Sequence, residues 1–218
     1  MRLIARLLTF FYRLLYHSFA FAYDAVAAVV SFGQWIDWTR TTLPYVQGAC
    51  VLEIGHGPGH LQSILNEATG TPQASSSLFV AGLDESAQMG RITRRRLVRA
   101  GIGSPRLARS LAQAIPFQAD AFDTVVSTFP SIFIFQMDTL AEVHRVLRTG
   151  GRFIVLPAAW PKNPLLRWLY RLTGESPADS LDIMQEKWSQ LYASAGFTCR
   201  TEIIDLRSSI ILLIIASK

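Results

Sequence analysis

The stretch that most constrains this chain is residues 51–61 (VLEIGHGPGHL), in which a short apolar run leads into a glycine-rich turn. The run contains a single acid, Glu53, and predicts the end of a buried parallel strand. The glycines at alternate positions are Gly55, Gly57 and Gly59. Without side chains they let the turn lie against a ligand, and Pro58 suits the first turn of a following helix. A strand, a glycine turn and a helix N-terminus together predict a nucleotide site.

The glycine spacing alone is a weak signal, because it is GxGxG and His60 stands where the dinucleotide fingerprint needs its third glycine. A second observation strengthens it, because residues 78–83 predict another strand, which ends at Asp84. A carboxylate at the tip of a second strand can accept both hydroxyls of a ribose. The alternative for Asp84 is an ordinary cap of the next helix. Residues 106–110 and 122–128 predict two further strands.

In this order, the motifs resemble those of the class I S-adenosylmethionine (SAM) methyltransferases, of the small type-11 kind. The matching residues are 51–61 (motif I), Asp84, Ser86 and Met89 (D-x-S-x-x-M), 114–126 (LPF…FD-x-V) and 140–156. The resemblance covers about residues 45–217. It implies an α/β fold with a doubly wound, seven-stranded, mostly parallel sheet whose last strand is antiparallel. The site is then expected at the carboxyl ends of strands one and four.

The resemblance also implies SAM as the cofactor and a set of residues that contact it. These residues are Glu53, Gly55, His56, Gly57, Gly59, Asp84, Glu85, Met89, Leu111, Ala112, Thr128, Phe129 and Tyr23. Leu111 departs from the family pattern, which has an acid there that meets the adenine amino group, so we expect the backbone of Leu111 and Ala112 to make this contact. Tyr23 with Asp24 resembles a pair that closes the cofactor pocket, and an ordinary packed tyrosine is the alternative. No residue is assigned as the catalytic base, and no metal site is predicted.

The N-terminal part predicts a helical extension ahead of the domain that carries these motifs. Residues 1–22 combine apolar residues with arginines at helical spacing, which is typical of a basic amphipathic helix in a membrane interface. Packing on the domain and a signal peptide are the alternatives. Residues 34–45 predict a further helix. We divide the chain into an extension at residues 1–44 and a domain at residues 45–218, with an insertion at 157–180 that is expected to shape the acceptor site.

Charge and hydropathy limit the partners. The chain has 218 residues, a net charge of +5 and a sequence pI of about 9.6, and 18 of its 21 basic residues are arginines, which bind phosphate well. Five of the arginines lie in residues 86–100, a predicted helix. This run is a solvated face or a surface for anionic head groups. Because it lacks the interleaved aromatic residues of RNA-binding surfaces, we expect no nucleic-acid partner. No uncharged apolar run is long enough to span a bilayer.

These features predict a SAM-dependent methyltransferase that acts on a hydrophobic or membrane-associated acceptor. The leading expectation is the amine of a phospholipid head group, because an acceptor that is already nucleophilic needs no general base. The alternatives are a quinone-type or other small molecule methylated on C, O or N, and a SAM-binding, membrane-associated protein without catalysis. His60 argues against a nicotinamide-dependent reductase. We expect a cytoplasmic protein held peripherally on the inner face of the membrane, and leave its oligomeric state open.

Overall fold

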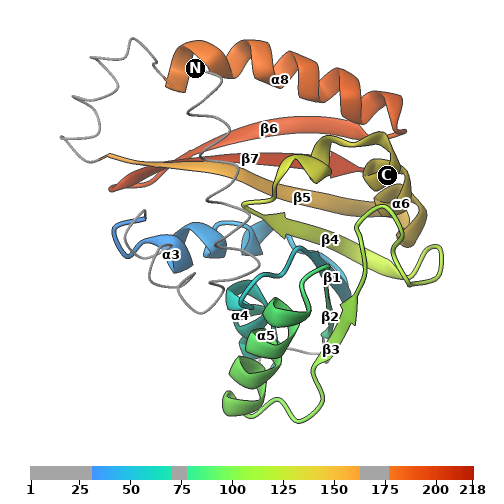
Figure 1. Cartoon of the computed structure of the whole chain (residues 1–218). Coiled ribbons are helices and arrows are strands. Elements are labelled where there is room, and N and C mark those ends of the chain that lie inside the picture. Colours follow the sequence, from blue (N-terminus) through green and yellow to red (C-terminus); the bar gives the residue numbers. More distant parts are fainter. Residues whose placement is uncertain (1–30, 70–77, 163–176) are drawn as a thin grey trace, which may run out of the picture.

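The computed structural model describes residues 31–69, 78–162 and 177–218. They form a seven-stranded sheet with helices on both faces (Figure 1). The strands are β1 (Cys50–Ile54), β2 (Phe79–Asp84), β3 (Arg106–Arg109), β4 (Phe122–Thr128), β5 (Leu147–Pro161), β6 (Thr198–Asp205) and β7 (Ser209–Ser217). Their order is β3-β2-β1-β4-β5-β7-β6, and only β7 runs antiparallel to its neighbours. This confirms the predicted doubly wound sheet. The strand order reverses between β1 and β4, where such folds bind their ligands.

The two faces of the sheet carry different helices. On one face lie α3 (Trp35–Arg40), α4 (His60–Thr69) and α5 (Ala87–Arg99), and on the other lie α6 (Met137–Val146) and α8 (Pro177–Ser194) (Figure 1). Short 3-10 turns, η2 (Leu43–Tyr45) and η3 (Ile132–Phe135), precede β1 and follow β4. Successive side chains of a strand point to opposite faces. The core on the α4 side contains Val51, Val80, Val126 and Ile154, and that on the α6 and α8 side contains Leu52, Ala81, Val125 and Phe153.

Strand β5 is longer than the sequence indicates. It continues to Pro161, and its outer half pairs with β7. Residues 157–161 therefore extend the sheet, because the apolar strand β7 offers backbone partners along this length. Helix α8 begins at Pro177. Of the expected insertion, residues 163–176 lie outside the described residues.

The segment just ahead of β1 packs against the far end of the sheet. Residues 34–45 form α3 followed by η2, two short elements in place of the single predicted helix. The indole N–H of Trp38 donates to the hydroxyl of Ser209 in β7 at 2.8 Å. The expected amphipathic helix at residues 1–22 lies outside the described residues. Among the helices that are described, none is long and apolar enough to cross a membrane.

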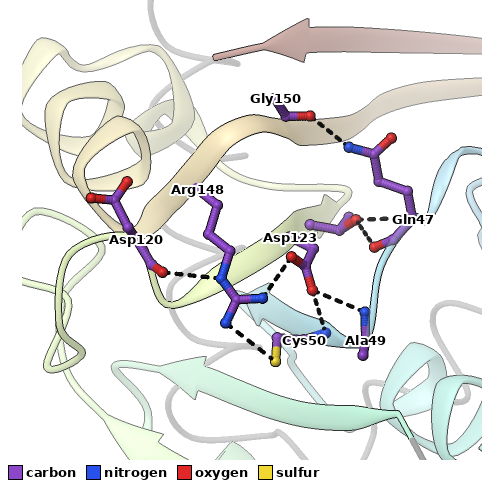
Figure 2. Close-up of polar contacts among 8 residues, drawn as sticks. Gln47, Ala49, Cys50, Asp120, Asp123, Arg148 and Gly150 are labelled. Atoms are coloured by element: carbon purple, nitrogen blue, oxygen red, sulfur yellow. Dashed lines mark hydrogen bonds and ion pairs between the residues drawn. The ribbon is translucent and has the colours of Figure 1, made fainter. Parts of the chain in front are cut away.

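The amino ends of β1, β4 and β5 are tied together by Asp123 (Figure 2). Its carboxylate accepts hydrogen bonds from the N–H groups of Ala49 (2.9 Å) and Cys50 (2.8 Å), and from the Arg148 guanidinium (2.6 Å). Gly48 allows this approach, because its φ is +71° and a Cβ there would lie 2.2 Å from the Cβ of Asp123. Burial alone would raise the pKa of Asp123, but the hydrogen bonds from Arg148 and the backbone lower it. This cluster fixes the strands whose opposite ends carry the candidate site.

Replacing Asp123 by alanine should lower the free energy of unfolding by about 2–4 kcal/mol, because two backbone N–H groups and a guanidinium lose their acceptor. Chemical denaturation measures the loss. Because the folded-state pKa of Asp123 lies below its unfolded value, its contribution is present above about pH 4 and is lost as the pH falls through the folded-state pKa. The difference between wild type and Asp123→Ala should therefore shrink in acid, and a difference that does not change with pH would contradict this account.

Candidate functional site

The glycine turn after β1 is hydrogen-bonded to the end of β2. The N–H of Gly55 donates to the carbonyl of Leu83 at 2.7 Å, and the N–H of Gly57 donates to Oδ2 of Asp84 at 2.9 Å. Gly57 has a φ of +50°, and no heavy atom of the described residues lies within 4 Å of the position that its Cβ would occupy. The turn therefore has open space where a side chain would be, as expected of a backbone that lies against a ligand.

Helix α5 holds the carbonyl groups of the same turn. The hydroxyl of Thr93 donates to the carbonyl of Gly57 at 2.7 Å, and the guanidinium of Arg96 donates to the carbonyl of Pro58 at 2.5 Å. Nδ1 of His56 lies 2.8 Å from the carbonyl of Gly57, and burial lowers the pKa of this histidine. A neutral His56 with its proton on Nδ1 is thus a second donor to that carbonyl. With its carbonyl fixed in this way, Gly57 directs its N–H to Asp84.

Two buried carboxyl groups lie at the carboxyl ends of β1 and β2, Glu53 (1% exposed) and Asp84 (3% exposed). Each oxygen of Asp84 accepts a backbone hydrogen bond, Oδ2 from Gly57 and Oδ1 from Ser86 at 2.8 Å. Burial raises the pKa of Glu53 to about 8, while a hydrogen bond from Gln62 lowers it and the charge of Asp84 raises it. Oε2 of Glu53 has no hydrogen-bond partner among the described residues. A buried oxygen without a donor is costly, so a ligand that brings a donor would complete the site.

The carboxyl end of β4, the neighbour of β1, carries an aromatic residue in a strained conformation. Phe129 has a φ of +49°, a left-handed value that is rare for a bulky side chain. Its N–H donates to the carbonyl of Leu156 at 2.7 Å, and its ring lies 4.1 Å, between centroids, from the ring of Trp35 in α3. Residues held in such conformations cluster at ligand sites. The aromatic pair Trp35–Phe129 is therefore a second part of the candidate site.

Leu111 and Ala112 reach the same edge through the end of β3. The N–H of Ser110 donates to the carbonyl of Asp84 at 3.3 Å, so the segment after β3 begins beside the second acid. Leu111 is 53% exposed and Ala112 is buried. The segment that contains Leu111 and Ala112 thus starts next to Asp84, and their contact with the adenine stays a prediction.

The other residues predicted to contact the cofactor differ in burial and in position. Thr128, the last residue of β4, is half-buried, and Glu85 is exposed. Met89 is fully buried in α5, and Gly59 lies so close to this helix that a Cβ would be 2.4 Å from one of its methyl groups. Gly59 therefore packs closely against α5, and the contact of Met89 and Gly59 with the cofactor stays a prediction. Tyr23 lies outside the described residues.

Sequence reasoning missed the residues that hold the site from behind. Thr93 and Gln62 contact the glycine turn and Glu53, yet each stands in a helix where the pattern shows only a buried stripe. Trp35 was predicted only to lie on a helix, and its stacking on Phe129 joins elements far apart in the chain. The one signal in the sequence for such a residue was a polar side chain on an otherwise apolar helix face. Gln62 is such a residue, and it is 1% exposed in the structure.

The strand order of this sheet, with a reversed strand between β5 and β6, is that of the class I SAM-dependent methyltransferases, and solved structures agree. A putative SAM-dependent methyltransferase from Methanococcus maripaludis superposes with a TM-score of 0.59 over 91% of each chain, at 19% identity. A possible histamine N-methyltransferase from Thermotoga maritima gives 0.59 over 89% of this chain and 94% of that one, at 17% identity. Likeness at such identity shows the fold alone.

Within this class, residues 12–176 match the model of the ubiE/COQ5 methyltransferase family, and the chain belongs to that family. It is 29% identical over 208 residues to the ubiquinone/menaquinone biosynthesis C-methyltransferase UbiE of Shewanella sp. (strain ANA-3), covering 84% of this chain and 80% of that protein. It is 31% identical over 160 residues to the UbiE protein of Marinomonas sp. (strain MWYL1), covering 71% and 62%. It is 32% identical over 165 residues to the demethylmenaquinone methyltransferase of Symbiobacterium thermophilum, covering 72% and 62%. The match thus spans less than two thirds of the last two relatives.

The residues present fit SAM, the methyl donor of this family. SAM has an ammonium group, and Oε2 of Glu53 is a buried acceptor without a donor. SAM also has two ribose hydroxyls, and a buried carboxylate such as that of Asp84, at the tip of β2, is the group that accepts hydrogen bonds from such a pair. The open space in front of Gly57 provides room for such a ligand.

The raised pKa of Glu53 should make the stability of the ligand-free protein depend on pH. Because its folded-state pKa of about 8 lies above the unfolded value of about 4.3, folding takes up a proton. The contribution of Glu53 is fully present below about pH 4 and is lost as the pH rises to about 8, with a slope of up to about 1.4 kcal/mol per pH unit. Glu53→Gln should remove this slope in chemical denaturation experiments. A variant with the same slope as wild type would refute the assignment.

Thr93→Val keeps the shape of the side chain and removes the hydroxyl that holds Gly57. It should weaken binding of S-adenosylhomocysteine, the demethylated product, by at least about tenfold, because the carbonyl of Gly57 loses one of its two donors. Thr93→Ser keeps the hydroxyl and should bind within about twofold of wild type. Isothermal titration calorimetry measures both, with thermal unfolding as a check of the fold. If a folded Thr93→Val binds as well as wild type, the turn does not depend on this hydroxyl.

Proposed function

We propose that this protein transfers the methyl group of SAM to a ring carbon of a quinone-type acceptor. The support comes from membership of the ubiE/COQ5 family and from relatives in Shewanella and Symbiobacterium that are named for quinone methylation. These names favour the quinone-type alternative over the phospholipid head-group amine that was the leading expectation from the sequence.

On the cofactor side, bound SAM supplies a methyl group on a positively charged sulfur, so the protein has little covalent chemistry to perform. We assign Asp84 to the ribose hydroxyls and Oε2 of Glu53 to the ammonium group. The turn at Gly57 lies against the cofactor, and Leu111 with Ala112 borders the adenine. These assignments are supported by the burial of both acids and by the unpartnered oxygen of Glu53.

The observation that carries the acceptor class is the pair Trp35–Phe129, in which Phe129 follows β4, the strand next to β1. Both residues are half-buried. Aromatic faces bind planar rings by offset stacking, and a reduced quinone ring is electron-rich enough to attack the methyl group from one of its carbons. The C–CH₃ bond forms as the S–CH₃ bond of SAM breaks, S-adenosylhomocysteine leaves, and the ring carbon then releases its proton to water. The protein then mainly holds the ring in line with the methyl group and excludes water. Because Trp35 precedes β1, we propose that the described part of the extension, residues 31–44, forms part of the acceptor site.

Purified full-length protein should methylate a reduced demethylmenaquinone with a short prenyl tail and should leave phosphatidylethanolamine unmodified, as mass spectrometry of the extracted products would show. Trp35→Ala should raise the KM for this quinol by about fivefold or more through lost stacking, with S-adenosylhomocysteine binding unchanged. Ile36→Ala, at the exposed neighbour on the same helix, is the control and should have little effect.

Two results would contradict this proposal. Methylation of phosphatidylethanolamine but not of the quinol would restore the head-group amine as the acceptor. SAM binding without methylation of either compound would favour a SAM-binding protein without catalysis.

A further inference from the structure

Residues 86–119 carry a concentration of positive charge that methyl transfer does not use. They contain seven arginines and no aspartate or glutamate, a net charge of +7, whereas the whole chain has +5 and its other residues together carry −2. The segment forms α5 and β3, which lie at the end of the sheet remote from α8 (Figure 1). Such an asymmetry favours association with a negatively charged partner.

Helix α5 presents four of these arginines to solvent on one side. Met89, Thr93 and Leu97 recur at every fourth residue and are buried. The exposed residues on the opposite side are Arg91, Arg94, Arg95, Val98 and Arg99. Arg96 turns instead to the glycine turn. We call Arg91, Arg94, Arg95 and Arg99 the arginine face.

Among the described residues, no acidic side chain neutralises the arginine face, because none forms an ion pair with any of its four members. On the adjacent edge strand β3, Arg106 lies over the ring of Phe79 at 4.6 Å, and Arg109 donates to the carbonyl of Glu85. These partners carry no charge where they are contacted, so β3 extends the positive surface.

We propose that the arginine face docks this protein on a bilayer that contains anionic lipids. Guanidinium groups form paired hydrogen bonds with phosphate. Val98, 51% exposed among the four arginines, is an apolar side chain suited to the membrane interface. Nucleic acid is a poorer partner, because α5 carries no aromatic residue on which bases could stack.

This inference goes beyond the proposed function and does not depend on the identity of the acceptor. Each arginine close to an anionic surface strengthens membrane partition by about fivefold. Four arginines therefore strengthen membrane partition on the order of several hundredfold at low ionic strength. The effect is smaller at higher ionic strength, because salt screens the attraction.

Vesicle flotation of the full-length protein tests the proposal, with vesicles of phosphatidylcholine alone or mixed with phosphatidylglycerol and with neither SAM nor acceptor present. The face variant combines Arg91→Gln, Arg94→Gln, Arg95→Gln and Arg99→Gln. The control variant combines Arg40→Gln, Arg152→Gln, Arg200→Gln and Arg207→Gln, with the same change of charge at positions outside α5 and β3. Wild type should bind the anionic vesicles and ignore the neutral ones. The face variant should bind at least about tenfold more weakly, and the control within about twofold of wild type.

Equal binding by the two variants would overturn the proposal, because net charge or other basic residues would then account for the attraction. Failure of wild type to bind anionic vesicles at low salt would also overturn it. So would stronger binding to a random-sequence DNA duplex that is lost in the face variant, since the partner would then be nucleic acid. Binding of S-adenosylhomocysteine to both variants checks that they fold. Because no methyl transfer is measured, failure here leaves the proposed function standing.

Discussion

The hydrogen bond from the N–H of Gly57 to the carboxylate of Asp84 is the interaction on which the candidate site depends. It joins the turn after β1 to the end of β2. The strand order reverses between β1 and β4, and β1 and β2 lie on the same side of this point. The carbonyl of Gly57 is held by Thr93 from α5, so the peptide groups on both sides of this residue are fixed. Helix α5 therefore fixes the turn, and the turn places the N–H of Gly57 on Oδ2 of Asp84.

The sheet could be predicted from the sequence because most of its strands are short apolar runs that end at recognisable turns. β4, over Phe122–Thr128, has the predicted bounds. The outer half of β5 could not be predicted, because residues 157–161 (PAAWP) contain two prolines and become a strand only through pairing with β7. The helix expected at residues 34–45 is divided because Pro44 lies within it, at the start of η2, and proline disfavours the interior of a helix.

The part of the site that faces a ligand could be predicted, whereas its support could not. The alternating glycines predict the turn, because its backbone needs their conformational freedom. The acid at the end of the second strand predicts Asp84 as a ribose contact, because a carboxylate there can accept both hydroxyls. The role of Thr93 depends on how α5 crosses the turn, and the unpartnered oxygen of Glu53 depends on what surrounds β1. The strain at Phe129 is likewise imposed by tertiary contacts, since phenylalanine itself disfavours a left-handed backbone. A single sequence carries no local mark of any of these three features.

The acceptor side of the site depends on contacts that the cofactor side does not share. α3 is fixed to the β6–β7 hairpin by the hydrogen bond from Trp38 to Ser209, and the hydroxyl of Tyr45 donates to Glu202 in the same hairpin. This attachment positions Trp35 over Phe129. The hairpin and α8 lie beyond residues 12–176, the part that matches the family model. A change in the hairpin would therefore move the aromatic pair and leave the glycine turn, which is held by α5, in place. The cofactor part and the proposed acceptor part of the site are thus anchored separately on one sheet, and the hairpin that anchors the proposed acceptor part lies outside the residues that match the family model.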